Sequence, residues 1–364
     1  MSSDYAATVV IPVHQLNRPV ARAAGSALAA GNPGEVKVLV VCHGIAADDV
    51  RGLLSEIPPE HVELMEFADG IPSPAGPMNA GLKAVATRYA SLLGSDDFLE
   101  AGALSQWISQ ADAGNADAVV APLRTQGGTP IRSPRLRLLR RGPLHPVRDR
   151  LAYRTAPLGL MRMSTVERLG LRFIAGLRTG EDMDFSLRLW FSGGRIEMGR
   201  PGSTYVVGED AVERVTGQML PLTEEFEALM GVLTADWVKE LPGSARHAIA
   251  IKILRVHVLS AMYRRGGGFA WTADDRKALA RAVQAVKAVA PSVERPLSVA
   301  ELELFRLAET PKSSLEAFTN ALSAWPSGGY RTQILTPRLW DNLRRESNFR
   351  YYGAEKITSR LPRK

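Results

Sequence analysis

Two adjacent carboxylates, Asp96 and Asp97, follow an apolar run in the stretch Arg88–Glu100. A strand that ends in carboxylates places their oxygens at the carboxyl edge of a sheet, where α/β proteins bind ligands. Hard divalent cations such as Mg²⁺ and Mn²⁺ choose oxygen ligands, and they bridge the phosphates of nucleotides. The pair therefore indicates a metal site. The structural alternative is that Asp97 or Ser95 caps the segment that follows.

The first half of the chain alternates between two kinds of segment. Apolar runs predict strands at 7–13, 36–42, 62–67, 88–94 and 117–122, and helical periodicity predicts helices at 18–30, 46–55, 77–87 and 100–113. This alternation is typical of a mostly parallel sheet covered by helices on both faces. Beyond residue 150 we expect, in order, a strand, two helices and a strand, at 155–162, 164–169, 181–192 and 194–198.

From about residue 220 the pattern becomes helical. Ser298-Val-Ala-Glu301 and Ser313-Ser-Leu-Glu316 have the spacing of capping boxes, and Thr272 begins a similar segment. The glycines at 266–268 predict a loop between two of these helices. The chain is thus expected to hold an α/β domain at 1–215, a helical domain at 216–330 and a basic, aromatic C-terminal segment at 331–364.

Four segments, in order along the chain, resemble the family 2 glycosyltransferases, which have the GT-A fold. They are Thr8-Val-Val-Ile-Pro-Val-His14, Val36-Lys-Val-Leu-Val-Val-Cys-His-Gly44, the stretch from Gly76-Pro-Met-Asn-Ala-Gly-Leu82 to Ser95-Asp96-Asp97, and Gly180-Glu-Asp-Met-Asp-Phe-Ser-Leu-Arg-Leu-Trp190. The resemblance covers residues 6 to 215 and implies a Rossmann-like GT-A domain.

The resemblance also implies an inverting transfer of a sugar from a nucleotide-sugar donor. Asp96 and Asp97 would hold a Mn²⁺ or Mg²⁺ ion that stabilises charge on the leaving nucleotide. Asp182, with Glu181 beside it, would take the proton of the acceptor hydroxyl. The first turn of a helix favours acidic residues without any catalysis, and this alternative stays open for both residues.

On the donor side, the resemblance implies a set of nucleotide-binding residues: Pro12, His14, His43, Asn79, Gly81, Lys83, Ser95 and Asp96. Three positions depart from the family pattern. Gly94 stands where a further carboxylate is expected, Cys42-His43 replaces an acidic pair, and Met78 replaces an arginine. Lys83 is the candidate substitute for that arginine, although an exposed helix lysine is the simpler interpretation.

Positive charge is concentrated in two segments. Residues 124–154 contain nine arginines and one acidic residue, and residues 331–364 contain nine basic and three acidic residues. Such segments attract polyanions or an anionic membrane face. The first segment lies where the family has its acceptor-facing insertion, so four arginines are expected to bind a glycan or anionic polymer acceptor: Arg135, Arg137, Arg140 and Arg141. Nucleic acid is not expected as a partner, because aromatic residues are not interleaved with the arginines.

Composition narrows the class of protein. A chain of 364 residues is long enough for about two domains, and Cys42 as the only cysteine excludes a disulfide framework and a cysteine-rich zinc site. The N-terminus lacks a signal-peptide pattern, and the apolar stretch 247–263 is too short and too charged to span a bilayer. We expect a cytoplasmic protein, with a peripheral contact at the inner face of the membrane as an option.

These features favour a nucleotide-sugar-dependent glycosyltransferase of the hexosyltransferase type. Its acceptor would be a hydroxyl of a glycan, a lipid-linked glycan or an anionic cell-envelope polymer, as in polysaccharide biosynthesis. One alternative is a catalytically impaired module that binds nucleotide or glycan, which the departures at Gly94, Cys42 and Met78 favour. The second alternative is a sugar nucleotidyltransferase, although the loop from His14 to Pro19 lacks the glycines of that class.

Overall fold

The chain folds into two compact units. The computed structural model describes residues 5–137, 140, 142–210 and 219–358. One unit comprises Met1–Leu136 and Arg141–Gln218, and the other comprises Arg137–Arg140 and Met219–Lys364. Within the described residues, no helix is long and apolar enough to cross a membrane.

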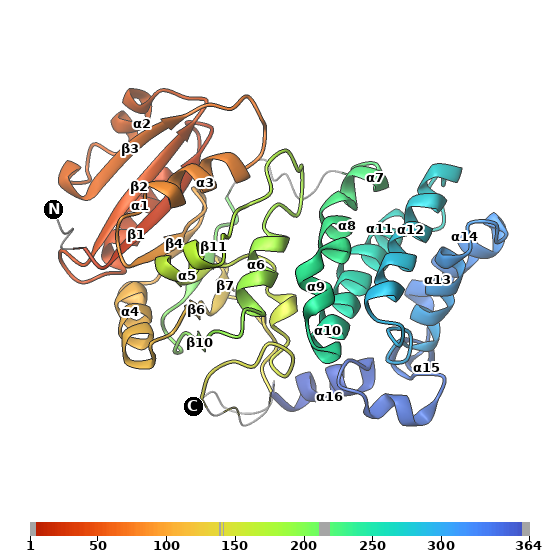
Figure 1. Cartoon of the computed structure of the whole chain (residues 1–364). Coiled ribbons are helices and arrows are strands. Elements are labelled where there is room, and N and C mark those ends of the chain that lie inside the picture. The colour runs from red at the N-terminus through yellow and green to blue at the C-terminus, as the bar shows by residue number, and fades with distance from the viewer. Residues whose placement is uncertain (1–4, 138–139, 141, 211–218, 359–364) are drawn as a thin grey trace. The chain divides into compact units, whose positions relative to one another are not determined.

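A seven-stranded sheet forms the centre of the first unit (Figure 1), with the strand order β10-β6-β9-β4-β1-β2-β3. Every neighbouring pair is parallel except the two that contain β9. The bounds are β1 (Ala7–Val13), β2 (Val36–His43), β3 (Val62–Phe67), β4 (Tyr89–Leu92), β6 (Ala118–Val120), β9 (Gly159–Arg162) and β10 (Ile196–Met198). The expectation of a mostly parallel sheet is confirmed.

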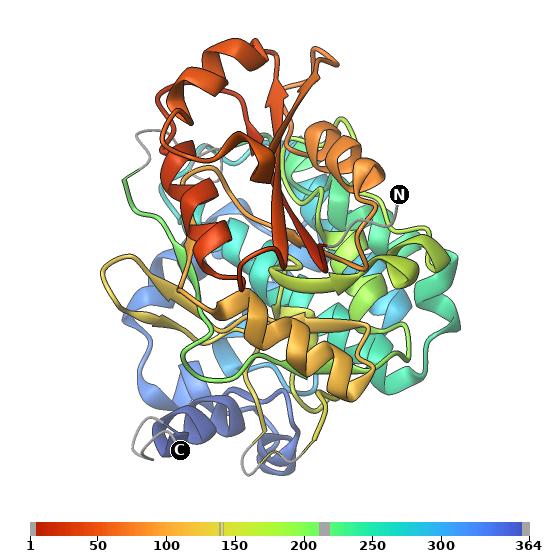
Figure 2. The same cartoon turned by 90° about the vertical axis from the view of Figure 1, so that its left-hand side faces the viewer.

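Helices cover both faces of this sheet (Figure 2). The odd-numbered residues of β1 share one core with α1 (Val20–Ala29), with Val50 of α2 (Ala47–Leu53) and with α4 (Ala103–Gly114). On the other face, α3 (Ala75–Ala84) lies so close that a Cβ on Gly81 would come within 2.3 Å of Val10 Cγ1. The helix backbone therefore packs directly on β1 and β2, and a residue with a side chain would not fit at position 81 without a shift.

A second, four-stranded sheet has the order β5-β11-β7-β8. Its strands are β5 (Phe98–Leu99), β11 (Tyr205–Val207), β7 (Leu123–Thr125) and β8 (Pro130–Ile131). Runs of two or three residues are too short to show alternation, so the sequence did not predict this sheet. It matters for the site because β5 begins directly after Asp97 and β11 carries Tyr205.

The remaining elements of the first unit are short. They are α5 (Met163–Arg168), α6 (Met183–Trp190) and two 3₁₀ turns, η1 (Pro59–His61) and η2 (Leu151–Tyr153). The predicted boundaries differ most for α3, which was expected at 77–87. It ends at Ala84 because Val85 has extended backbone angles and leads into β4.

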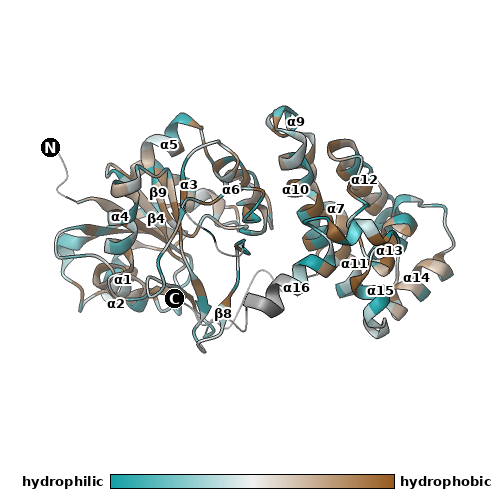
Figure 3. Ribbon diagram, turned by 90° about the horizontal axis from the view of Figure 1, so that it is seen from below, coloured by the Kyte–Doolittle hydropathy of each residue, from teal (hydrophilic) through white to brown (hydrophobic). Residues whose placement is uncertain are grey.

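The second unit is helical, as expected, and its helices carry both apolar and polar residues along their length (Figure 3). Its helices are α7 (Leu222–Glu225), α8 (Glu227–Thr234), α9 (Asp236–Glu240), α10 (Gly243–Ile253), α11 (Ser260–Arg265), α12 (Ala273–Val289), α13 (Val299–Glu309), α14 (Leu315–Ala324), α15 (Tyr330–Ile334) and α16 (Asn348–Thr358). A π-helical segment η4 (Leu254–Leu259) and the 3₁₀ turns η5 (Trp325–Ser327) and η6 (Leu339–Leu343) connect them.

Capping residues begin three of these helices. The predicted capping boxes at Thr272 and Ser298 are confirmed. In each, the hydroxyl accepts from the backbone N–H three residues later, and the carboxylate of that later residue accepts from the backbone N–H of the capping residue. The box predicted from Ser313 is wrong by one residue: Ser314 caps α14, accepting from the Ala317 N–H at 3.3 Å. Ser313 instead accepts a hydrogen bond from Arg276 at 2.6 Å.

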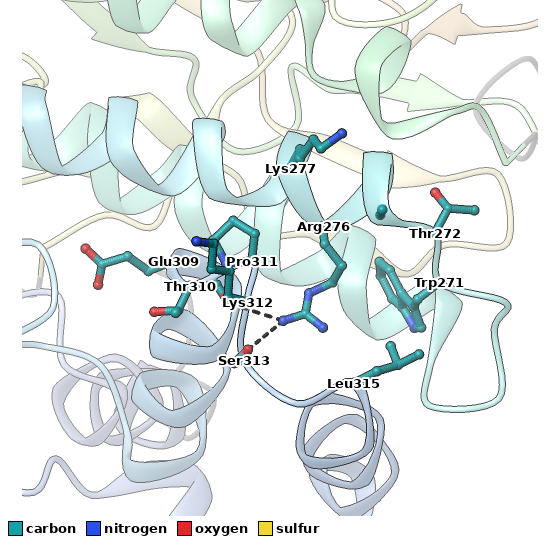
Figure 4. Close-up of a pocket in the computed structure, with 11 residues that line it drawn as sticks. Trp271, Thr272, Arg276, Lys277, Glu309, Thr310, Pro311, Lys312, Ser313 and Leu315 are labelled. Atoms are coloured by element: carbon teal, nitrogen blue, oxygen red, sulfur yellow. Dashed lines mark hydrogen bonds between the residues drawn. The ribbon is translucent and has the colours of Figure 1, made fainter.

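That Arg276 bond lies in a cavity of about 710 Å³ between the start of α12 and the loop from α13 to α14 (Figure 4). Arg276 also donates to the carbonyl oxygens of Leu307 and Thr310, at 3.3 and 3.4 Å. These are carbonyls that the end of α13 leaves without helical partners. The arginine therefore closes the C-terminus of α13, and its guanidinium lies 4.1 Å from the centre of the Phe318 ring.

Candidate active site

The carboxyl ends of four neighbouring parallel strands bring titratable residues together in the first unit. His14 follows β1, His43 ends β2, Asp69 follows β3, and Asp96 follows β4. Partial burial lowers the pKa of His14, Arg18 and His43 lower it further, and Asp96 raises it. His14 therefore lies close to all three charged groups. In open α/β sheets this edge is where ligands bind.

Asp97 is held by the protein on both carboxylate oxygens. Oδ2 accepts from the Tyr205 hydroxyl at 2.5 Å, and Oδ1 accepts from the Gly208 N–H at 2.8 Å. Burial and then the charge of Asp97 hold the pKa of Tyr205 well above its usual range, so the hydroxyl stays a donor. Asp97 thus ties the loop after β4 to β11.

Asp96 faces two arginines from the start of α1. Its Oδ2 accepts from Arg18 at 3.2 Å, and its carbonyl oxygen accepts from Arg22 at 2.5 Å. Arg22 is also bidentate to Asp210. Neither arginine was predicted as a site residue from the sequence. Their i, i+4 spacing directly after the first strand was the available signal, because it places both on one side of the helix start.

A divalent cation fits Asp96 better than it fits the pair. Both oxygens of Asp97 accept from protein donors, whereas among the described residues a side-chain contact is seen at Oδ2 of Asp96 alone. Within the described parts of the chain, no three His, Cys, Asp or Glu side chains gather to hold a metal ion. Mg²⁺ is nevertheless commonly bound through one carboxylate and substrate phosphates. The metal therefore stays a prediction, with Asp96 as its ligand.

Gly94, the departure from the family pattern, has a steric reason. The Asp97 N–H donates to the Gly94 carbonyl at 3.0 Å, which closes a tight turn. A Cβ on Gly94 would lie 2.6 Å from Asp97 Oδ2. A carboxylate at position 94 is therefore incompatible with the Asp97–Tyr205 contact as it stands. Ser95, which the sequence analysis assigned to donor binding, is buried within this turn.

Asp69 is a residue that sequence reasoning missed. Its Oδ1 lies 2.9 Å from His43 Nε2 and accepts from the Ile71 N–H at 3.0 Å. These hydrogen bonds, the backbone one first, lower the pKa of Asp69. The third strand ends two residues before Asp69, so position at a strand end was the signal that could have found it. Asp69 supplies a carboxylate close to the place where the family has its acidic pair.

The predicted donor-binding residues on α3 lie on a helix that leads away from the carboxyl edge of the sheet where His14, His43 and Asp96 lie. The Asn79 amide exchanges two hydrogen bonds with the Phe173 backbone, at 2.8 and 2.9 Å. A Cβ on Gly81 would meet the side chains of Val10 and Val41, and nucleotide binding at Gly81 stays a prediction. Lys83 is exposed in the last turn of α3, which leads to the start of β4, and the structure does not bring it to the carboxyl edge. Pro12 lies in β1 opposite Val41, one residue before that edge.

Glu181 and Asp182 directly precede α6. The Glu181 carbonyl accepts from the Ile174 N–H at 3.0 Å, and the Asp182 carbonyl accepts from the Ser186 N–H at 2.9 Å. Phe173 stacks on Phe185 of α6 with ring centres 4.6 Å apart. Burial raises the pKa of Glu181. Together with the Asn79 contacts, these interactions fix the loop before α6 against α3.

The predicted acceptor arginines divide between the two units. Arg135 belongs to the first unit, whereas Arg137 and Arg140 belong to the second. All three are half-buried and have interaction partners. Arg141 lies outside the described residues. Binding of an acceptor by these side chains stays a prediction.

Comparisons with known proteins identify relatives in sequence and in fold. No protein-family model matches the chain. The succinoglycan biosynthesis protein ExoO of Rhizobium meliloti (strain 1021) is 33% identical over 113 residues, which is 31% of this chain. The match spans about a third of that protein, 32% of its length.

Crystal structures of S. aureus TarS have the same fold. The complex of TarS residues 1–349 with UDP-GlcNAc has a TM-score of 0.71 at 16% identity, over 90% of this chain and 94% of that chain. The complex with UDP has a TM-score of 0.69 at 14% identity, over 89% and 92%. A longer TarS structure gives 0.67 at 15% identity, over 88% of this chain and 55% of that chain. The chain therefore has the GT-A fold with a helical C-terminal region, as its four sequence segments predicted.

Proposed function

We propose that this chain is a glycosyltransferase that uses a UDP-linked sugar. The observation that carries the proposal is the group of His14, His43, Asp69 and Asp96 at one carboxyl edge of the sheet. S. aureus TarS, with the same fold, was crystallised in complex with UDP-GlcNAc. Such an edge is where an open α/β sheet binds a nucleotide.

Asp69 and His43 would recognise the base. The pKa of Asp69 is lowered, so the carboxylate is ionised at neutral pH and can only accept hydrogen bonds. It favours a base that presents a ring N–H, as uracil does. His43 holds one oxygen of Asp69 at 2.9 Å and so orients the carboxylate.

Arg18 and Arg22 would supply positive charge for the leaving diphosphate. Arg18 lies beside Asp96 just before α1, with a side chain only 11% exposed. A partly buried guanidinium keeps its charge and stabilises an oxyanion strongly where water is excluded. A divalent cation held by Asp96, when bound, would add Lewis-acid stabilisation of the same phosphates.

Asp182 would act as the base. The acceptor oxygen would form its bond to the anomeric carbon as the bond from that carbon to the phosphate oxygen breaks, and its proton would pass to Asp182. A single displacement of this kind inverts the anomeric configuration. Burial raises the pKa of Glu181 beside it, so the charged form of that neighbour is disfavoured relative to an exposed carboxylate. The contacts of Asn79 and Phe185 hold the loop that carries both residues.

The acceptor would be a glycan or an anionic envelope polymer, bound with help from Arg135, Arg137, Arg140 and Arg141. The name of the relative ExoO, a succinoglycan biosynthesis protein, supports a polysaccharide acceptor. We place the reaction in the cytoplasm, at the inner face of the membrane.

The alternative is a nucleotide-binding module without turnover, which the glycine at position 94 and the engaged oxygens of Asp97 favour. An Asp182→Asn variant discriminates between the two. For an enzyme, UDP should bind as tightly as to the parent chain in calorimetry, while transfer from a UDP-sugar falls by about 10² to 10⁴, the usual contribution of a general base.

Two results would count against the enzyme. One is the absence of UDP binding to the parent chain, with or without Mn²⁺. The other is a parent chain that binds UDP but transfers no sugar to any glycan acceptor, which would establish the binding module. Arg188→Lys on α6, a conservative change of a partly exposed residue, is the control and should keep activity.

A further inference from the structure

In the segment that contains η6, apolar side chains are exposed and polar side chains are buried, the reverse of the usual arrangement. Leu339 and Trp340 are 79% and 84% exposed, the two highest values for large apolar side chains among the described residues, and Leu343 is 62% exposed. In the same turn, Asp341 and Asn342 are buried. The hydrophobic effect ordinarily drives the opposite arrangement.

Polar contacts, centred on the buried Asp341 and Asn342, hold this turn in place. The Thr336 N–H donates to Asn342 Oδ1 at 3.0 Å, and the Ser347 hydroxyl donates to the Asn342 carbonyl at 2.6 Å. Arg344 pairs with Asp341, and Arg350 donates to the Leu343 carbonyl at 2.9 Å. The outward direction of the apolar side chains is therefore specified by a hydrogen-bonded network rather than left to a loose chain.

More apolar and aromatic side chains surround the turn in sequence. Tyr330, Phe349 and Tyr352 are 68%, 44% and 48% exposed. These six exposed residues lie on α15, η6 and α16, and α16 contacts both of the other elements. We name them the C-terminal apolar patch: Tyr330, Leu339, Trp340, Leu343, Phe349 and Tyr352. Clusters of exposed apolar residues with a polar rim mark sites that bind a partner or a membrane.

The charge around the patch favours a membrane over a protein partner. Within residues 331–350, Arg331, Arg338, Arg345 and Arg350 are exposed, whereas the two acidic residues of that range, Asp341 and Glu346, are buried. The accessible charge beside the patch is therefore positive. Basic residues beside Trp, Tyr and Leu are the composition of surfaces that lie in the headgroup region of an anionic bilayer.

We propose that the C-terminal apolar patch docks the helical unit on the surface of an anionic membrane. Trp340, Leu339 and Leu343 would enter the boundary between headgroups and acyl chains, and the arginines would contact lipid phosphates. This inference deepens the inner-face location given under the proposed function. Its test measures no activity, so either idea can fail without the other.

The test is co-sedimentation of the full chain with vesicles of phosphatidylcholine alone or with added phosphatidylglycerol. Binding should need the anionic lipid and should weaken as salt rises. Trp340 is the one strongly exposed tryptophan of the described residues, so its insertion should shift the fluorescence emission to the blue. Trp340→Ser with Leu343→Ser should weaken binding by at least about tenfold.

Two control variants separate the patch from general effects. Leu315→Ser removes a 51% exposed leucine elsewhere in the helical unit and should leave vesicle binding unchanged. Arg338→Glu should weaken binding several-fold, whereas Arg281→Glu, an exposed arginine on α12, should not. All five substituted positions are exposed, and circular dichroism should confirm that each variant keeps its helical content.

Three outcomes would overturn the proposal. The first is no binding to anionic vesicles. The second is equal loss of binding in the Trp340 and Leu315 variants, which would mean non-specific adsorption. The third is a concentration-dependent dimer that Trp340→Ser dissociates, without vesicle binding by the parent chain, which would assign the patch to a second copy of this chain.

Discussion

At the residue scale, two neighbouring aspartates of one motif have different tasks. Asp97 is bound on both oxygens by Tyr205 and Gly208, so it maintains the loop after β4. Asp96 accepts from Arg18 on Oδ2, and under the proposed function it is the carboxylate that would hold a cation. Adjacent residues in an extended or turning backbone point in different directions, so adjacency in sequence does not make two ligands of one site.

The first prediction concerns Asp69, which the proposed function assigns to the base. Asp69→Asn keeps the size of the side chain but removes the charge that accepts a ring N–H. We expect UDP to bind roughly tenfold more weakly, as for the loss of one charged hydrogen bond. Calorimetric titration with UDP measures this. Asp48→Asn, at a side chain that is 96% exposed on α2, should bind UDP as the parent does.

Glu181 leads to a prediction about pH. Burial raises its pKa in the folded state, so its contribution to stability is fully present below the unfolded-state pKa of about 4.3 and is lost as pH rises through the folded-state pKa. Glu181→Gln removes this dependence. The free energy of unfolding of the variant relative to the parent should therefore increase from pH 4 towards pH 7. Urea unfolding across that range checks the sign, and a constant difference would contradict it.

At the element scale, the position of α3 determines much of the site. Its first turn lies beside Asp69, Asn79 holds the loop that carries Asp182, and Gly81 brings the helix onto β1. Because α3 connects the carboxyl end of β3 to β4, its later turns lead away from that edge. This is why Lys83 does not join the donor residues although it lies only four residues from Asn79.

Two glycine-to-alanine substitutions test the packing of α3. A Cβ at Gly81 meets Val10 and Val41, at 2.3 and 3.1 Å, so Gly81→Ala should destabilise the fold by about 1–3 kcal/mol. A Cβ at Gly25 on α1 meets nothing within 4 Å. Gly25→Ala should therefore stabilise the fold by about 0.5–1 kcal/mol through helix propensity. Urea denaturation of both variants should show opposite signs, and destabilisation of both would refute the argument.

At the scale of the whole molecule, the chain has two compact units with two different surfaces. The first has a polar edge built from strand ends, and the second has the C-terminal apolar patch with its arginines. The ligands proposed for them differ accordingly: a nucleotide for the first and an anionic bilayer for the second.

Hydrogen exchange on the full chain should separate these two surfaces. UDP should protect backbone amides near residues 13–22, 43–47, 67–76 and 93–98, because a bound ligand suppresses local opening. Anionic vesicles should protect residues 330–352 instead. Protection of both regions by UDP alone would contradict the separate assignments. Phosphatidylcholine vesicles are the control for the second experiment.

The sequence alone determined the sheet, the helical second unit and the strand-end position of the Asp pair. β1 and β3 have the predicted bounds, and the capping boxes at Thr272 and Ser298 form as predicted. These features arise from periodicity and capping, which act within a few residues of the chain. Local patterns are sufficient to specify them.

The tertiary structure decided the partners of the site residues. Tyr205 lies 108 positions from Asp97, Phe173 lies 94 positions from Asn79, and His43 lies 26 positions from Asp69. It also decided that Leu339 and Trp340 point outward while Asp341 is buried. No local pattern encodes these contacts, because each depends on how distant strands and loops pack once the sheet has formed and on which buried polar groups must find partners.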